Sequence, residues 1–363
     1  MNTLKRIFAI ALCLLVTLTC LVGCHKKGEI AVKIGDVEFT SGYYACALVF
    51  ADSEARTIVE ENLSEEGELP KEIDYYKQKV EDTDYVKWVE NTVLENLKEL
   101  AAVITLCKEA EVQLDSETIA LADSNADYLW DTYGYSALME NNGVAKETFK
   151  QYMRDGYLAE TYFDHLYGKG GEKEIAADKL STQLTENYAL VNKIEVSLSG
   201  LEEEQATDKK TQLSVFEESL KNGSKTFEQV YLEYNEIEAE DHKHEEAEGD
   251  ELQPLDPHAT VIGSDDTDYS SDYYESAKAM AVGEIKVVTL EEGESIALIV
   301  KKDIAADPYY IDDLDSNLRN DIAGDDYRDD IAEYGEKLGC VINESSTKQF
   351  KVKKIVYPET ATY

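Results

Sequence analysis

The residues best suited to metal chemistry are two histidines in a strongly acidic tract. His242 and His244 lie within residues 236–251, where most neighbours are Glu or Asp. Imidazole and carboxylate groups are ligands for divalent ions, so the tract could bind one. A charge run of this kind is also typical of a solvated surface loop. The loop interpretation is favoured, and neither a metal nor another cofactor is expected.

Other catalytic patterns in the chain are weak. Asp265, Asp266 and Asp268 suggest calcium binding, but the tract lacks the glycine and the distal glutamate of a calcium loop. The sequence shows no Ser-His-Asp nucleophile signature and no phosphate-binding glycine loop. His165 falls inside a predicted helix, where a structural role is the simpler interpretation. No residue is therefore predicted to be catalytic.

Cys24 is the residue with the clearest predicted chemistry. Lys5 and Arg6 precede an apolar run over residues 7–22, which ends in Leu21-Val22-Gly23-Cys24. A basic start, a short apolar stretch and small residues at the cleavage position are typical of a secretory signal. The last four residues resemble a bacterial lipobox, in which the cysteine is acylated and begins the mature chain. We predict a signal peptide over residues 1–23 and lipidation, for example with palmitate, at Cys24.

A single transmembrane anchor is the alternative interpretation of the same apolar run. Residues 7–22 are shorter than the roughly 20 residues that a spanning helix needs. The Gly-Cys junction is followed directly by the polar residues 25–27, which favours cleavage. The predicted location is therefore the extracytoplasmic face of the cell membrane. Acyl chains would hold the protein there, and stable anchoring takes more than one chain.

The charge of the chain excludes one class of partner. The formal net charge is −41, and removal of residues 1–23, with Lys5 and Arg6, lowers it to −43. Binding to nucleic acid through phosphate contacts needs clustered Lys and Arg, so no nucleic-acid partner is expected. Hydrophobic residues make up 43% of the sequence, which predicts that most of it folds.

Three cysteines remain once Cys24 has been assigned to the anchor. Cys46, Cys107 and Cys340 are odd in number and widely spaced, and none forms a metal-type Cys-x-x-Cys pair. One disulfide bridge stays open as an alternative, but buried free thiols are the favoured prediction.

The first part of the mature chain is predicted to be mainly helical. Residues 29–40 alternate apolar and polar side chains around a Gly-Asp turn, which predicts a hairpin, and a helix follows. Residues 54–83 are acidic and contain Gly67 and Pro70, which indicates a loop with poor helices. Apolar residues at helical spacing predict helices over 84–107, 116–133, 145–167 and 176–188.

A different pattern begins near residue 189. Strands are predicted over 189–198, 260–263, 285–290 and 295–301, and helices over 202–222, 226–234 and 271–282. This β-α-α-β-α-β-β order describes a compact α/β unit. A helix over 308–338 and a strand over 350–356 are predicted to complete the chain.

The order of these elements resembles the PrsA and SurA type of extracytoplasmic foldase. VKIGDVEFTSGYYACAL and YGYSALMENNGVAKETFKQYMRDGYLAETYFDHL are similar to the start and the signature helix pair of that family. KTFEQV and YYESAKAMAVGEIKVVTLEEGESIALIV resemble stretches of its parvulin-type prolyl isomerase domain.

The resemblance implies an α+β fold in which a helical chaperone domain, built from N- and C-terminal segments, is interrupted by a parvulin-like α/β domain. The implied chaperone domain covers residues 24–188. The parvulin-like domain covers 189–303 with the acidic loop 236–251, and residues 304–363 pack back on the chaperone domain.

The positions matched to the parvulin active site depart from the family pattern. A histidine is expected in the first strand and another in the last hairpin, where this chain has Lys193 and Ser295. Lys278 replaces a pocket aromatic, although Tyr274 lies four residues earlier. A lysine disfavours an apolar proline pocket because desolvating its charge is costly. A prolyl isomerase must lower the barrier to rotation about the peptide bond, which is about 18–20 kcal/mol, and needs an organised site to do so. Because the matched positions differ from the family pattern, the domain is expected to be a degenerate, inactive form of a parvulin domain.

The function implied is that of a membrane-anchored chaperone or foldase that holds unfolded exported polypeptides. The helix over 145–167 carries an aromatic stripe, which is first interpreted as helix–helix core. Its candidate client-binding residues are Tyr152, Met153, Tyr157 and Phe163, because tyrosine combines apolar contact with a polar tip. An active peptidyl-prolyl cis-trans isomerase and a surface lipoprotein with one specific partner stay open as alternatives. A homodimer stays open beside a monomer.

Overall fold

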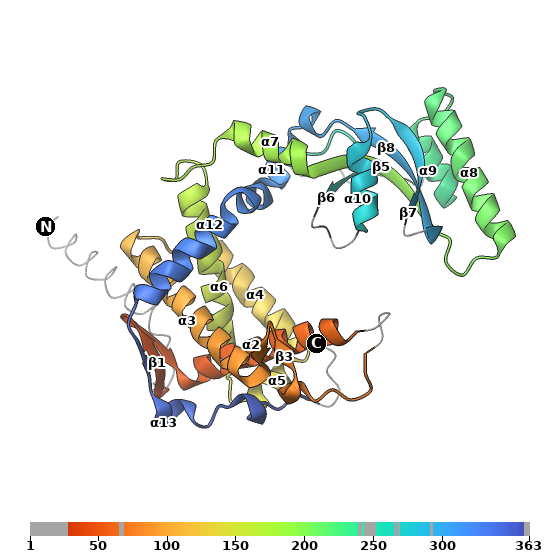
Figure 1. Cartoon of the computed structure of the whole chain (residues 1–363). Coiled ribbons are helices and arrows are strands. Elements are labelled where there is room, and N and C mark those ends of the chain that lie inside the picture. Colours follow the sequence, from red (N-terminus) through yellow and green to blue (C-terminus); the bar gives the residue numbers. More distant parts are fainter. Residues whose placement is uncertain are drawn as a thin grey trace, which may run out of the picture. The chain divides into compact units, whose positions relative to one another are not determined.

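The computed structural model describes residues 28–64, 69–238, 242, 252–264, 266, 269–290 and 293–358, which separate into two compact units (Figure 1). The first unit comprises the described residues within Met1–Leu166 and Asp326–Tyr363, and the second those within Tyr167–Asp325. Both units combine helices with antiparallel strands, and helices predominate. The predicted α+β fold class, with one unit built from both ends of the chain, is confirmed.

Residues from both ends of the chain form the sheet of the first unit. β1 (Ile30–Ile34) and β2 (Val37–Thr40) form the predicted hairpin, and its turn contains Gly35 at φ +56°, a conformation that glycine tolerates. β9 (Cys340–Ile342) pairs antiparallel with the other edge of β1. β3 (Lys79–Val80) and β4 (Thr83–Asp84) form a separate short hairpin.

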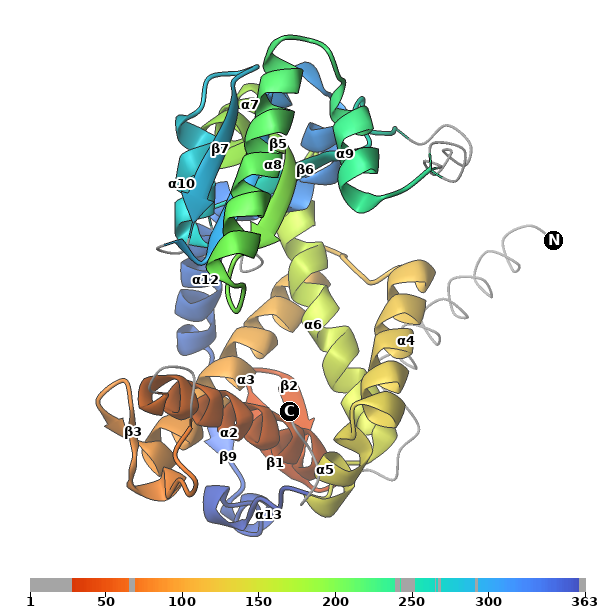
Figure 2. The ribbon, with the colours of Figure 1, turned by 90° about the vertical axis from the view of Figure 1, so that its right-hand side faces the viewer.

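The helices of the first unit pack around two adjacent cores. Thr40 and Asp115 cap two of them by accepting a hydrogen bond from the backbone N–H three residues later. One core joins α2, α3 and the sheet, and the other joins α2, α4, α5 and α6. Figure 2 shows α4 and α6 side by side. These helices are α2 (Ser41–Leu63), α3 (Tyr85–Glu109), α4 (Ser116–Thr132), α5 (Tyr135–Asn141), α6 (Lys146–Tyr167), the second half of α12 (Asp315–Lys337) and the short α13 (Glu344–Thr347).

The second unit is built on a four-stranded antiparallel sheet with the order β6-β5-β8-β7. One face of the sheet packs on α10 and the other on α8 and α9. The boundary with the first unit lies at residues 166/167 and 325/326, outside the predicted 188/189 and 303/304, because α7 and α11 pack with this unit. Its elements are α7 (Ala177–Asn187), β5 (Tyr188–Ser197), α8 (Glu203–Lys221), α9 (Phe227–Asn235), β6 (Ala259–Gly263), α10 (Ser271–Ala279), β7 (Ile285–Leu290), β8 (Ser295–Lys302) and α11 (Tyr309–Asp313).

Three local predictions are wrong. Residues 54–63 continue α2, because Ala55 and Val59 extend its buried stripe. The helix predicted over 308–338 is divided into α11 and α12 at Leu314. The strand predicted over 350–356 is irregular with one short turn at Val352–Lys354, because the segment pairs with no described strand and packs Val352 into the core of α2, α3 and the sheet.

The three cysteines that the structure describes carry free thiols. Cys46 and Cys107 are buried, as predicted, and burial raises the pKa of both thiols. Cys340 is exposed on β9, which corrects the prediction of a buried thiol at that position.

Candidate functional site

Two of the four positions matched to the parvulin site lie on the same face of the sheet in the second unit. β5 and β8 are antiparallel neighbours, in which Lys193 pairs with Ile299 and Ser197 pairs with Ser295. Side chains alternate between the two faces along a strand. Lys193 and Ser295 therefore both belong to the face that α10 covers.

Lys193 lies against aromatic rings. Its Nζ atom is 3.9 Å from the centre of the Tyr269 ring and 5.6 Å from the centre of the Tyr273 ring. The same amine lies 3.7 Å from a carboxylate oxygen of Glu195. Cation–π contact and ion pairing thus stabilise the ammonium group where it is. A proline ring needs apolar surroundings, and this charge makes the surface poorly suited to one.

Ser295 is buried in the sheet, on the face that α10 covers. The residue is 4% exposed, and its Oγ atom has no hydrogen-bond partner among the described residues. A histidine exchanges protons near neutral pH, whereas a serine hydroxyl reacts only beside an activating base. The position therefore supplies neither an acid nor a base.

Tyr274 and Lys278 bind the end of a helix and do not join Lys193. The Tyr274 hydroxyl donates to the carbonyl oxygen of Asn187 at 3.0 Å. Lys278 Nζ donates to the carbonyl oxygens of Thr185 at 3.0 Å and Tyr188 at 3.4 Å. Thr185 and Asn187 belong to the last turn of α7 and Tyr188 is its C-cap residue, and the carbonyls at this end of a helix attract donors and positive charge. Burial lowers the pKa of Lys278.

An open hollow of about 680 Å³ lies elsewhere on the second unit. Glu217 and Lys221 of α8 line it together with residues 283–287, at the edge strand β7. Ile285 and Val287 pack toward α8, on the face opposite to Lys193. None of the four positions matched to a parvulin site lines this hollow.

In the first unit, the predicted client-binding stripe is mostly engaged in helix packing. Tyr152 stacks on Phe50, with ring centres 4.9 Å apart, and lies 5.4 Å from the ring centre of Tyr43. Phe163 is 6% exposed and meets the Tyr327 ring edge-on at 5.2 Å. These two residues therefore stabilise the unit, as the core interpretation of the stripe expects.

The other two members of the stripe are partly buried. Met153 packs against the core shared by α2, α4 and α6. The Tyr157 hydroxyl accepts a hydrogen bond from Asn125 of α4 at 2.6 Å. Contact between Met153 or Tyr157 and a client stays a prediction.

Sequence reasoning missed an exposed apolar surface on α4. Leu121, Tyr128 and Tyr133, the α4 surface patch, are 52%, 55% and 55% exposed. Leu121 and Tyr128 are seven residues apart and share a helix face, and the rings of Tyr128 and Tyr133 meet edge-on at 5.3 Å. The opposite face of α4 buries Ala122, Ala126 and Trp130. This second apolar stripe was visible in the sequence as a departure from a one-sided helix.

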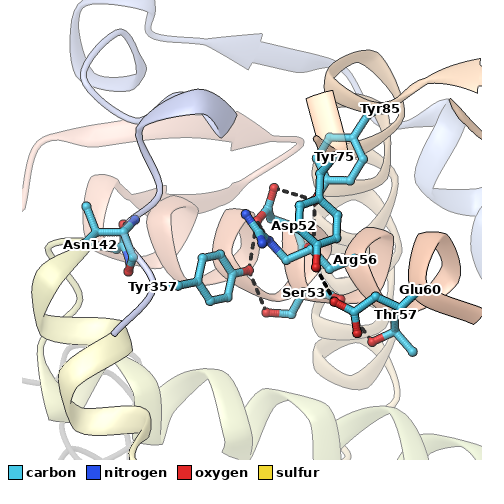
Figure 3. Close-up of polar contacts among 10 residues, drawn as sticks. Asp52, Ser53, Arg56, Thr57, Glu60, Tyr75, Tyr85, Asn142 and Tyr357 are labelled. Carbon is cyan, nitrogen blue, oxygen red and sulfur yellow. Dashed lines mark hydrogen bonds and ion pairs between the residues drawn. The ribbon is translucent and has the colours of Figure 1, made fainter. Parts of the chain in front are cut away.

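A buried polar network was also missed. Asp52 of α2 is fully buried and accepts hydrogen bonds from Arg56 Nε at 3.0 Å, the Tyr85 hydroxyl at 2.9 Å and the Tyr357 hydroxyl at 2.8 Å (Figure 3). The Arg56 guanidinium lies between the rings of Tyr357 and Tyr75, 4.0 and 4.2 Å from their centres. The only sequence signal was the Asp52–Arg56 spacing of four residues. We call these five residues the Asp52 network.

The network ties the C-terminal segment to the first unit. Beside Tyr357, the Asn142 side chain donates to the carbonyl oxygen of Val356 at 3.0 Å and accepts from its N–H at 2.9 Å (Figure 3). Two consecutive residues are therefore fixed by side chains from α2 and from the end of α5. The polar groups here bind one another, so the arrangement is structural.

Asp155 of α6 is a second carboxyl in a desolvated position. It accepts hydrogen bonds from the Tyr43 hydroxyl at 2.8 Å and from Gln151 Nε2 at 2.7 Å. Burial raises the pKa of Asp155 from 3.8 to about 6, although these two hydrogen bonds and Arg154 oppose the change. The raised pKa means that ionisation of Asp155 works against folding.

Replacement of Asp155 by asparagine is expected to stabilise the protein at pH 7.5 and to change little at pH 4. Because the folded-state pKa exceeds the ordinary value, the stabilisation is present at low pH and is lost as pH rises through about 6. The pKa difference corresponds to at most about 3 kcal/mol, and partial solvent exposure reduces the expected gain to about 1–2 kcal/mol. Urea unfolding of Asp155→Asn and wild type at both pH values measures it. Equal gains at both pH values would contradict the assignment.

His242 lies beside a histidine that the sequence did not single out. The His242 and His258 rings stack with centres 5.3 Å apart, and Glu228 of α9 lies next to them. His258 follows Asp256-Pro257 and directly precedes β6. Its position between a turn and a predicted strand is the sequence signal that could have identified it. His244, Asp265 and Asp268 lie outside the described residues.

Cys24 and the predicted signal peptide lie outside the described residues as well. Within the part of the chain that the structure covers, no helix combines the length and the apolar character needed to cross a membrane.

Comparison with known proteins gives matches only among solved structures. No protein-family model matches the chain, and no curated protein matches its sequence. Foldase protein PrsA from Streptococcus pneumoniae is similar at 14% identity with a TM-score of 0.41, over 79% of this chain and all of that one. PrsA from Lactococcus lactis is similar at 11% identity with a TM-score of 0.37, over 89% of this chain and all of that one. PrsA from Bacillus subtilis is similar at 14% identity with a TM-score of 0.30, over 72% of this chain and 90% of that one. Similarities at this level assign neither a function to the chain nor a role to an individual residue.

Proposed function

We propose that this chain is a membrane-anchored extracytoplasmic chaperone that holds unfolded exported polypeptides and does not catalyse prolyl isomerisation. The observation that carries the proposal is the α4 surface patch, where three large apolar side chains are more than half exposed. Contiguous apolar side chains at a surface are typical of interaction sites. Unfolded clients expose the apolar and aromatic segments that such a patch would bind.

The charge of the chain suits this role. A net charge of −41 keeps a protein soluble and discourages self-association. A complex that carries an exposed, unfolded client would gain from the same repulsion. The acidity therefore supports a holding function without determining which clients bind.

Lipidation of Cys24 would place the patch near the membrane. Cys24 precedes the first residue of β1, Ile30, by six positions, and a tether this short would hold the first unit close to the bilayer. Exported chains emerge there before they fold. Anchoring is thus part of the proposed function.

Suppression of aggregation tests the proposal. Mature protein is expected to prevent aggregation of a reduced, unfolded secreted client at stoichiometric ratio, measured by light scattering. The variant Leu121→Ser/Tyr128→Ser/Tyr133→Ser is expected to lose most of this activity, because it removes the apolar surface of the α4 surface patch. Val215→Ser/Leu255→Ser is the matched control, since these exposed apolar residues, 57% and 75% exposed, lie in the second unit.

Two results would contradict the proposal. Failure of the wild-type protein to suppress aggregation would exclude a holding function, provided that circular dichroism shows it folded. Equal loss in the patch variant and in the control would exclude the α4 surface patch as the binding surface.

Peptidyl-prolyl isomerase activity is expected to be absent. Lys193 and Ser295 offer no acid–base pair, and the lysine charge lies beside the rings where a proline would bind. In a protease-coupled assay with a proline peptide, wild type and Lys193→Ala are both expected to give the uncatalysed rate. A faster rate that falls on substitution of Lys193, Tyr274 or Ser295 would overturn this prediction.

A further inference from the structure

A second group of side chains that could bind a ligand lies in the second unit, apart from Lys193 and Ser295. Glu228 comes from the first turn of α9, His258 directly precedes β6, and His242 comes from the acidic tract between them. One ligand atom from each of the three side chains lies within 4.8 Å of the other two. His258 Nε2 and a carboxylate oxygen of Glu228 are 4.0 Å apart. We call these three residues the His–Glu cluster.

Aromatic packing positions the two imidazoles of the cluster. Tyr231, one turn after Glu228 on α9, lies with its ring centre 4.5 Å from that of His258 and 5.8 Å from that of His242. The two imidazole planes are within 7° of parallel. Phe227 meets His258 edge-on, with its ring centre 5.9 Å from that of His258. The rings are therefore held by neighbours on a regular helix.

Hydrogen bonds fix the backbone that carries His258. Its N–H donates to Asp256 Oδ1 at 3.0 Å. Asp256 Oδ2 accepts from Asn192 Nδ2 at 3.0 Å and from Lys302 Nζ at 2.5 Å, so the turn is attached to β5 and β8. The side chain of His258 is only 9% exposed. The backbone at this ligand position is consequently attached to the sheet through Asp256.

We propose that Glu228, His242 and His258 form a divalent metal site, with zinc as its occupant. Two imidazoles and one carboxylate are a ligand set that zinc accepts, with a fourth position left for water. Ligand atoms at about 2.0–2.1 Å from a tetrahedral zinc are about 3.3 Å apart. Binding would draw the three side chains together by about 1 Å, within the reach of side-chain rotation.

The ligand types separate zinc from the other common divalent ions. Calcium and magnesium take oxygen ligands, whereas imidazole nitrogen suits zinc and its first-row neighbours. The high negative charge of the chain attracts every cation, but it cannot by itself select for zinc. Selectivity for zinc over calcium therefore distinguishes this site from general binding to exposed acids.

The metal would cross-link parts of the second unit that are far apart in sequence. In the sequence, Glu228 precedes the acidic tract and His258 follows it, and His242 lies within it. An ion bound to all three attaches the tract to α9 and to the start of β6. Ligands that bind only the folded state raise its stability, so zinc is expected to raise the melting temperature of this unit.

Titration of the mature chain with zinc, followed by calorimetry, tests the proposal. Wild type is expected to bind one zinc ion at pH 7.5, and cobalt in its place is expected to give the visible spectrum of a tetrahedral centre. His242→Ala and His258→Ala are expected to lose more affinity than the roughly 10–100-fold that loss of a second-shell partner causes. Glu228→Gln is expected to weaken binding less.

Matched controls separate the site from nonspecific binding. Glu233→Gln changes an exposed acid on the same helix, and His165→Ala removes a histidine from the first unit; both should bind zinc as wild type does. Circular dichroism of the metal-free variants checks their folding. The proposal is overturned if wild type binds no zinc, if both histidine variants bind it unchanged, or if calcium displaces it at equal concentration. None of these results bears on aggregation suppression, so the two proposals fail independently.

Discussion

Replacement of Asp52 by alanine is expected to destabilise the first unit by about 3–5 kcal/mol, because it removes one partner of a buried ion pair. The carboxylate is fully buried, and Arg56 would lose the only carboxylate to which its Nε donates (Figure 3). Burial alone would lower the pKa of Arg56, yet the hydrogen bond and charge of Asp52 raise it above its ordinary value. The variant would leave that guanidinium with aromatic faces as its main contacts.

Tryptophan fluorescence during urea unfolding measures this effect in one unit. Trp88 and Trp130, the two tryptophans of the sequence, lie in α3 and α4 of the first unit. Glu333→Ala is the matched control, because Glu333 and Lys337 are also four residues apart but 70% and 66% exposed. Its expected cost is about 0.3–0.5 kcal/mol. A loss below about 1 kcal/mol for Asp52→Ala would mean that the network does not support the unit.

The hydroxyl of Tyr357 provides a graded test of the same network. Tyr357→Phe keeps the ring over Arg56 and removes one hydrogen bond to Asp52. A single net hydrogen bond contributes about 0.5–1.5 kcal/mol, or up to about 3 kcal/mol with a charged partner. The order Asp52→Ala, Tyr357→Phe, Glu333→Ala in decreasing cost is what the geometry requires.

The local pattern of apolar residues predicted the helices and strands whose buried residues lie close together in the sequence. The helix expected over 84–107 is α3, and the strand expected over 189–198 is β5, each shifted by one or two residues. In α3 buried side chains recur at the helical period, and in β5 a buried run over 189–192 passes into alternation, so the signal is contained in the segment itself. β9 carries no such signal, since all three of its residues are exposed, and its pairing with β1 depends on a partner about 300 residues away.

The candidate site shows the same limit. The alternation of side chains along a strand, together with the pairing of β5 with β8, is enough to place Lys193 and Ser295 on one face of the sheet. The partners of Tyr274 and Lys278 are main-chain carbonyls of α7, which no side-chain pattern reveals. His258 is likewise a lone histidine in the sequence. Only the fold brings it to His242 across the acidic tract.

The close approach of two helices in the first unit leads to the second large effect, at Gly335. A methyl group at position 335 of α12 would lie 2.8 Å from the carbonyl oxygen of Lys98 and 2.9 Å from its carbonyl carbon, in α3. Both atoms belong to the backbone of a regular helix and cannot turn away. Alanine is favoured over glycine in a helix by about 1 kcal/mol, so Gly335→Ala would be stabilising if the contact were absent.

Gly335→Ala is instead expected to destabilise the first unit by about 1–3 kcal/mol, because overpacking must separate α12 from α3. Gly156→Ala is the control: it lies in α6, and no described atom comes within 4 Å of the added methyl group, so a gain of up to about 1 kcal/mol is expected. Helix propensity favours alanine at both positions, so a loss of stability at 335 together with a gain at 156 would come from the packing of the added methyl group. Separation would also strain the ion pair of Lys98 with Glu336, 2.7 Å long beside the contact. Equal gains in both variants, measured by tryptophan fluorescence, would show that α12 does not pack at this distance.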